Sequence, residues 1–164
     1  MLRIRERAIM SKDRKPAREA SLCIGTATRK ASRRLTQLYD DALEPCGLRS
    51  TQFAILAELD RRSLEPPTMR ELADALVMDR SALGHNLRPL ERNELIALDE
   101  SEEDRRRRHV VMTPQGKAKF KEAKRLWQTA QDRFNAVFGQ SQAADLRATL
   151  LAIAYDVRLA KLRN

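Results

Sequence analysis

Apolar residues recur every three or four positions along most of the chain, which is the spacing of one face of an α-helix. The first repeat predicts a helix over residues 17–46, and its members are Ala27, Ala31, Leu35, Leu38 and Ala42. Gly47 follows directly and predicts a left-handed cap at the end of this helix, with Leu48 folding back over it.

Three shorter helices are predicted before residue 95. Ser50 is the expected N-cap of the first, which runs through the stretch TQFAILAELDRR and stops before Pro66 and Pro67. Its predicted core face consists of Phe53, Ile55, Leu56 and Leu59. The second begins with a capping box, in which Thr68 and Glu71 each bond the backbone N–H of the other. It is short, ends near residue 78, and its inward-facing residues are Leu72, Ala75 and Leu76.

The third of these helices covers residues 80–92. Asp79 is its expected N-cap, and Asn93 is expected to end it in the left-handed conformation. Pro89 interrupts the regular pattern and predicts a kink or a tightened last turn. The apolar stripe of this helix consists of Leu83, Leu87 and Leu90. Its opposite face carries the polar residues Arg80, Ser81, His85, Asn86 and Arg88.

Two strand-like segments, 95–98 and 109–112, flank the highly charged stretch DESEEDRRRR. They predict a β-hairpin, and a hairpin this small is stable only when it packs on other elements. We therefore expect it to lie against the helices. The charged tip has two interpretations at this point: a solvated loop, or an arginine-rich tip directed at a phosphate backbone.

Two long helices are predicted after the hairpin. Thr113 as N-cap and Pro114 at the first helical position begin the first helix, Gly139 ends it, and Ser141 is expected to cap the second. The apolar repeat of the first is Phe120, Ala123, Trp127, Ala130, Phe134 and Val137. That of the second is Leu146, Leu150, Ile153, Val157 and Ala160. Both repeats are seams for packing against other helices.

The charge balance of the 164-residue chain points to an anionic partner. The formal net charge of +9 attracts polyanions, either nucleic acid or an anionic membrane face. Residues 1–16 are rich in Lys and Arg and have no clean period, so we predict either a mobile basic arm that adds non-specific DNA affinity or a solvated tail. No apolar run approaches the roughly 20 residues of a membrane helix, and the charged start is unlike a secretory signal. We therefore expect a cytoplasmic protein with no membrane partner.

Little in the sequence suggests catalysis or metal binding. The two histidines, His85 and His109, have no nucleophile and acid at a recognisable spacing, and no glycine-rich phosphate loop is present. Cys23 and Cys46 belong to no CxxC motif or Cys/His cluster. We therefore expect a protein that is not an enzyme, with no catalytic residues, no metal and no cofactor.

The order of helices and hairpin between residues 50 and 113 is that of a winged helix-turn-helix. In such a unit the exposed side chains of one helix reach base edges in the major groove, and the hairpin places a cation in a neighbouring minor groove. The alternative is a protein-interaction module that binds its partner through the two long C-terminal helices, in which case the basic surface is incidental.

Three stretches resemble the MarR family of bacterial transcriptional regulators: LTQLYDDALEPCGLRSTQFAILAEL, MRELADALVMDRSALGHNLRPLERNELI and EDRRRRHVVMTPQGK. They occur in the order and spacing of that family, and the resemblance spans about residues 20–160. The most specific part is the wing pattern, in which Asp104 and Arg106 precede a strand and the segment Thr113 to Gly116.

The resemblance implies a mainly α fold that forms an obligate homodimer on a pseudo-palindromic operator. The helix in 17–47 and the two long helices in 114–164 would form the dimerisation part, and 48–113 would form the DNA-binding part. Arg106 would enter the minor groove, while Asp104 would orient Arg105 or Arg106 through a charge-assisted hydrogen bond. The implied DNA-binding residues are Arg80, Ser81, His85, Asn86, Arg88, Asp104, Arg105, Arg106 and Arg107.

The resemblance also implies regulation, because many family members bind a small aromatic or anionic effector between their dimerisation and DNA-binding parts. Candidate pocket residues are Cys23, Phe53 and Trp127, although aromatic residues at helical spacing are also ordinary core residues. Other members sense oxidants through a cysteine in the first helix, so redox sensing at Cys23 is an alternative. We expect a sequence-specific, nucleoid-associated regulator, a repressor that an effector releases from DNA.

Overall fold

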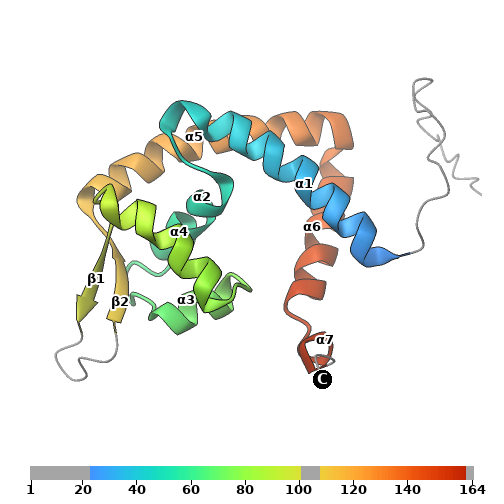
Figure 1. Ribbon diagram of the computed structural model, residues 1–164. Helices are drawn as coiled ribbons and strands as arrows, with labels where there is room; N and C mark the ends of the chain where they lie inside the picture. The colour runs from blue at the N-terminus through green and yellow to red at the C-terminus, as the bar shows by residue number, and fades with distance from the viewer. Residues whose placement is uncertain (1–22, 101–107, 162–164) are drawn as a thin grey trace, which may run out of the picture. The chain divides into compact units, whose positions relative to one another are not determined.

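The computed structural model describes residues 23–100 and 108–161, which are mainly helical with one two-stranded antiparallel hairpin (Figure 1). This confirms the predicted fold class. Contacts divide the chain into two units, and the division falls between Leu35 and Thr36 in the sequence of α1. The elements are α1 (Ile24–Leu43), a 3-10 turn (Glu44–Cys46), α2 (Ser50–Arg61), α3 (Met69–Ala75), α4 (Arg80–Arg92), β1 (Ile96–Glu100), β2 (Arg108–Met112), α5 (Pro114–Phe138), α6 (Gln140–Ala154) and α7 (Val157–Lys161).

The core of the second unit lies among α2, α3, α4, the hairpin and the first half of α5. The predicted apolar faces of α2 and α4 are confirmed, since all of their members are buried. This shared core fixes the short α3 and the longer α4 relative to the hairpin. Its fully buried side chains include Leu43, Ile55, Leu56, Leu72, Leu83, Leu90 and Val110.

The start of α2 differs from the prediction. Arg49 is the N-cap and Ser50 is the first helical residue, so the expected Ser50 cap is wrong. Asp40 of α1 instead accepts a hydrogen bond from the Ser50 N–H at 2.7 Å. Burial would raise the pKa of Asp40, but the hydrogen bonds from Ser50 and the charge of Arg49 lower it overall. A charged carboxylate therefore stabilises the positive end of the α2 dipole.

The N-caps of α3 and α4 follow the prediction more closely. The backbone N–H of Thr68 donates to Glu71 Oε2 at 2.8 Å, and the N–H of Glu71 donates to Thr68 Oγ1 at 3.3 Å. The Asp79 carboxylate accepts from the Ala82 N–H at 2.7 Å at the first turn of α4. Both predicted N-caps are confirmed, and they define where the two helices begin.

The turn between α3 and α4 contains an unusual left-handed residue. Val77 has a φ of 52°, and the Met78 N–H donates to the Ala73 carbonyl at 2.9 Å to close a Schellman motif at the end of α3. A β-branched residue is strained in this conformation, because its Cβ crowds the following carbonyl. The side chain offers little packing in return, since it is 59% exposed.

Val77→Gly is therefore expected to raise the free energy of unfolding by about 0.5–1 kcal/mol, because glycine adopts positive φ without strain but loses more entropy on folding. Urea unfolding of the two proteins measures the difference. Val77→Ala is the matched control: it keeps a Cβ, so it should stabilise less than glycine. A lower unfolding free energy for Val77→Gly would show that the valine side chain stabilises the turn.

The end of α4 also departs from the prediction. The helix passes through Pro89 and continues to Arg92, so Asn93 keeps a right-handed φ of −91° as the C-cap. Glu94 is the left-handed residue instead, with a φ of 55°. The Leu95 N–H then donates to the Leu90 carbonyl at 2.9 Å. The left-handed position is one residue later than expected because the Schellman motif places it after the C-cap.

The hairpin is attached to the segment that precedes α3. Ile96 pairs with Met112 and Glu100 with Arg108 in an antiparallel register, which extends the predicted strands slightly. The Val110 N–H donates to the Pro67 carbonyl at 2.8 Å, and His109 Nδ1 lies 2.8 Å from the Pro66 carbonyl oxygen. The base of the wing is therefore held next to the start of α3.

The C-terminal helices begin as predicted but end differently. Thr113 caps α5 by accepting a hydrogen bond from the Gly116 N–H at 2.9 Å, and Gly139 ends the helix. Gly139 is also the N-cap of α6, so the predicted Ser141 cap is wrong. The last helix is not continuous either: α6 stops at Ala154, and α7 begins after Asp156. Within the described residues, no helix is both long and apolar enough to span a membrane.

Candidate nucleic-acid interface

The helix-turn-helix formed by α3 and α4 presents one polar face of α4. Burial of the α4 leucine stripe leaves the opposite side of the helix toward solvent. Four of the five polar residues predicted there are exposed: Arg80, Ser81, His85 and Arg88. Asn86 is half-buried, and its Nδ2 donates to the Ala82 carbonyl at 2.8 Å, so part of its amide is already used within the helix.

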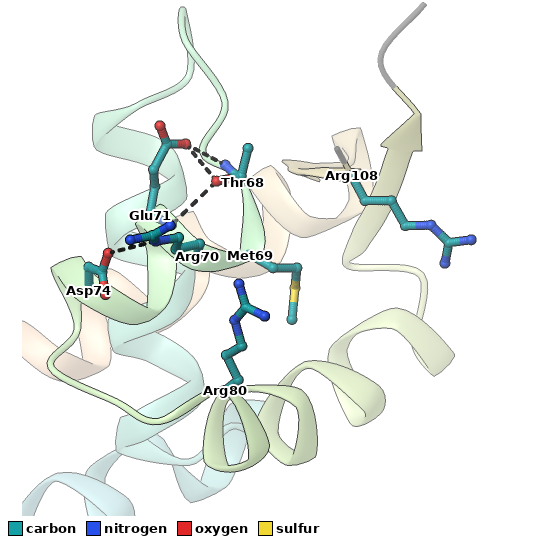
Figure 2. A pocket seen from close by; sticks show the side chains of 7 residues that line it. All are labelled: Thr68, Met69, Arg70, Glu71, Asp74, Arg80 and Arg108. Carbon is teal, nitrogen blue, oxygen red and sulfur yellow. Dashed lines mark hydrogen bonds and ion pairs between the residues drawn. The ribbon is translucent and has the colours of Figure 1, made fainter. Parts of the chain in front are cut away.

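A hollow of about 620 Å³ lies where α3, α4 and β2 meet (Figure 2). Figure 2 shows Arg80 reaching from the first turn of α4 toward α3, while Arg108 extends from β2. The residues that line the hollow are Thr68, Met69, Arg70, Glu71, Asp74, Arg80 and Arg108. Three arginines from three different elements therefore border one concave surface.

The two acids of the hollow are engaged with the protein itself. Hydrogen bonds from the backbone N–H and the hydroxyl of Thr68 lower the pKa of Glu71, which keeps its capping carboxylate charged. Asp74 lies 3.9 Å from Arg70 Nε in an exposed pair, and such pairs contribute little to stability. Among the described residues no ion-pair partner is found for Arg80. Its charge is available to an anion that enters the hollow.

Sequence reasoning missed Arg70 and Arg108 as neighbours of Arg80. Arg70 belongs to the capping-box segment, and Arg108 is the last of four consecutive arginines, of which only the first three are among the DNA-binding residues that the resemblance implies. Their spacing along the chain gives no signal, because the fold alone brings residues 70, 80 and 108 to one surface. The wing-tip candidates Asp104, Arg105, Arg106 and Arg107 lie outside the described residues.

The two aromatic pocket candidates lie in an aromatic cluster of the second unit. The rings of Phe53 and Trp127 are stacked with centroids 5.7 Å apart, and Phe53 also contacts Phe120 at 5.4 Å. Phe53 is buried and Trp127 is half-buried against the core. These contacts favour a core role for both residues. Cys23, the third candidate, belongs to the other unit.

Cys23 lies at the start of α1 and is exposed. Its carbonyl accepts hydrogen bonds from the N–H groups of Thr26 and Ala27, each at 3.1 Å. Hydrogen bonds from the Thr26 side chain and from nearby backbone N–H groups lower the pKa of the Cys23 thiol. Cys46, in contrast, is buried, and its Sγ donates to the Leu43 carbonyl at 3.0 Å.

The comparisons with known proteins agree with this geometry. The family model described as the MarR family matches residues 47–107, which include α3, α4 and part of the hairpin. No curated protein sequence matches the chain.

Solved structures match over most of the chain. The transcriptional regulator MosR of M. tuberculosis in complex with DNA is 30% identical, with a TM-score of 0.74 over 84% of this chain and 98% of that chain. The transcriptional repressor CouR bound to a 23-mer DNA duplex is 28% identical, with a TM-score of 0.72 over 80% and 92% of the two chains. CouR, known from Rhodococcus jostii RHA1, also matches when bound to p-coumaroyl-CoA, at 25% identity and a TM-score of 0.72 over 82% and 93%.

Three observations agree on one family. They are the geometry of the wing and helix-turn-helix, the match to the family model, and the near-complete coverage of a regulator that is 30% identical. The chain belongs to the MarR family of transcriptional regulators, which are not enzymes.

Proposed function

We propose that this regulator is a homodimeric repressor that binds a pseudo-palindromic operator and leaves it when a small effector binds. The observation that carries the proposal is the exposed polar face of α4 beside a hollow bordered by Arg70, Arg80 and Arg108. A helix of this kind fits the major groove, and flanking cations bind phosphates. The comparable MosR and CouR structures contain DNA, and CouR is a repressor.

Each part of the interface has a proposed role. Ser81, His85 and Asn86 of α4 read base edges in the major groove, while Arg80 and Arg88 bind the phosphate backbone. Arg106 of the wing enters the minor groove, and Asp104 orients it or Arg105 through a charge-assisted hydrogen bond. Arg107 adds a further phosphate contact. The protein acts in the cytoplasm, on the nucleoid.

The dimer would cover a large apolar surface at the C-terminal end of the chain. Single exposed apolar residues are ordinary, but clusters of them mark interaction sites. The exposed apolar residues of α5, α6, α7 and their junctions are Val137, Phe138, Leu150, Leu151, Ile153, Tyr155, Val157 and Leu159. A second copy of the chain is the occupant that a palindromic operator requires.

The direct test is selection of bound sequences from random duplex DNA at near-physiological salt. Enrichment of a palindrome with half-sites about 10 base pairs apart supports the proposal, since that spacing places both α4 helices on one side of the duplex. If no sequence is enriched and the protein binds all duplexes with an affinity that depends only on salt, the proposal is contradicted and the protein-interaction module is favoured.

Arg106→Ala is expected to weaken operator binding by about 1–3 kcal/mol, because a wing arginine in a narrow minor groove gains from the strong negative potential there. Fluorescence anisotropy on the selected operator measures the change. Arg133→Ala, which removes an exposed charge from α5, is the matched control and should change affinity far less. Loss of the dimer in Arg106→Ala, instead of loss of affinity, would mean that this arginine has another role.

The effector is proposed to be a small aromatic or anionic molecule, in keeping with p-coumaroyl-CoA in CouR. Such a ligand would change the separation of the two α4 helices in the dimer, so that both no longer dock together. Titrating aromatic acids and their CoA thioesters against the operator complex should identify a compound that releases DNA while sedimentation still shows a dimer. Release that coincides with dissociation of the dimer would contradict this mechanism.

Regulation by oxidation of Cys23 is a second candidate, favoured by its exposure and lowered pKa. The thiolate would attack a peroxide oxygen, forming a sulfenic acid while the peroxide is reduced to water. Peroxide should then weaken operator binding by wild type and Cys46→Ser, but not by Cys23→Ser. Iodoacetamide should label Cys23 in the folded protein and Cys46 only after unfolding. Equal peroxide sensitivity of all three proteins would exclude Cys23 as the sensor.

A further inference from the structure

We propose that the N-terminal half of α1, residues 24–35, is a second DNA-binding surface that contacts phosphates flanking the operator. The inference rests on the proposed function in taking DNA as the partner. This half of the helix contains four cations and no acidic residue. All four cations are exposed: Arg29, Lys30, Arg33 and Arg34.

The arrangement of these cations is unfavourable for an isolated helix. Arg29 and Arg33, like Lys30 and Arg34, are four residues apart, and like charges at this spacing repel each other. The acids Asp40 and Asp41 lie near the other end of α1. A polyanion bound along the basic residues would relieve this repulsion.

The positions of three of the four cations leave them accessible in a dimer. At helical spacing, Arg29, Lys30 and Arg33 share the side of α1 opposite Ile24, Ala31 and Leu35, whereas Arg34 lies next to Ala27 at the border of the apolar side. In the proposed dimer the apolar side is the one available to a partner helix, so the basic side remains toward solvent. The proposal therefore does not compete with dimerisation for the same face.

The character of the apolar side favours DNA over a lipid surface as the partner. Helices that lie on membranes insert large residues such as Trp, Phe and Leu opposite their basic face. Ala27 and Ala31 occupy the middle of this side, and alanine contributes little to insertion. The regular line of phosphates on duplex DNA matches a basic face that extends over two turns.

The test compares two duplexes, one limited to the selected operator and one that extends it by about 15 base pairs on each side. Anisotropy is measured with the full-length protein at several salt concentrations. Wild type is expected to bind the long duplex about tenfold tighter, with a steeper salt dependence. The variant Arg29→Gln/Lys30→Gln/Arg33→Gln/Arg34→Gln should bind both duplexes equally and lose about 0.9 from the salt slope for each phosphate contact removed. Its affinity for the short operator should not change.

A charge-matched variant, Lys121→Gln/Arg125→Gln/Arg133→Gln/Arg147→Gln, removes four exposed cations of α5 and α6. It should keep the preference for the long duplex. If both variants lost the preference for the long duplex equally, the proposal would be overturned, because that preference would then depend on net charge alone. If no operator is found, the two four-residue variants are compared on one random duplex of fixed length, and the α1 variant should show the shallower salt dependence of the two. Wild type without a length preference, or α1-dependent binding to anionic vesicles instead, would equally overturn it.

Discussion

Gly116→Ala is expected to lower the free energy of unfolding by about 3 kcal/mol, the upper range for forcing an extra carbon into a filled site. A Cβ at this position would overlap the backbone carbonyl oxygen of Leu95 and lie 2.8 Å from Met112 Cγ. The carbonyl belongs to the backbone and has no rotamer by which to move away. The first turn of α5 would have to separate from the base of the hairpin.

This close approach explains why the wing pattern ends in Thr-Pro-x-Gly. Thr113 Oγ1 accepts from the Gly116 N–H and donates to the Glu94 carbonyl at 2.6 Å, while the Thr113 N–H donates to the Leu95 carbonyl at 3.1 Å. These bonds draw the start of α5 onto the residues that enter β1. Glycine is required here because there is no space for a side chain.

Thermal and urea unfolding measure the effect, and Gly84→Ala provides the matched control. Gly84 lies inside α4, and a Cβ added there would meet nothing within 4 Å, so alanine should stabilise the helix by about 0.5–1 kcal/mol. The change from glycine to alanine is thus expected to lower the free energy of unfolding at Gly116 and to raise it at Gly84. A neutral Gly116→Ala would show that α5 can shift without loss of packing.

The predictions that held were those determined by neighbouring residues. Thr68, Asp79 and Thr113 cap their helices because each side chain reaches the N–H three residues ahead. The polar face of α4 was predictable for a similar reason, since burial of its leucines determines which side is exposed. Local sequence therefore defined the helix-turn-helix and its candidate DNA-reading face.

Two of the predictions that failed depended on contacts from elsewhere in the chain. The start of α2 uses Asp40, which lies ten residues before Ser50 and in another helix. The end of α6 coincides with a tertiary contact, in which the Tyr155 hydroxyl donates to the Ala75 carbonyl at 2.9 Å. The hollow bordered by Arg70, Arg80 and Arg108 likewise exists only once α3, α4 and β2 are packed. Periodicity carries no information about such long-range partners.

Leu150→Lys/Ile153→Lys is expected to dissociate the proposed dimer and to weaken operator binding by about 10²–10⁴-fold, because a monomer loses the gain from binding two half-sites at once. The two residues lie on one side of α6 and are 39% and 48% exposed in the single chain. In the dimer these side chains would be buried, and an ammonium group buried without a partner is strongly unfavourable. Sedimentation velocity and anisotropy on the same samples measure the two effects.

Ala152→Lys on the opposite side of α6 is the control, since it adds a single lysine at an exposed position outside the predicted seam. It should remain dimeric and bind the operator normally. Because obligate dimers owe their stability to association, the double variant should also unfold at a lower temperature, whereas the control should not. A double variant that stays dimeric would place the dimer interface elsewhere. A monomer that binds the operator with full affinity would mean that the two half-sites are not bound together, which would remove the basis for a palindromic operator.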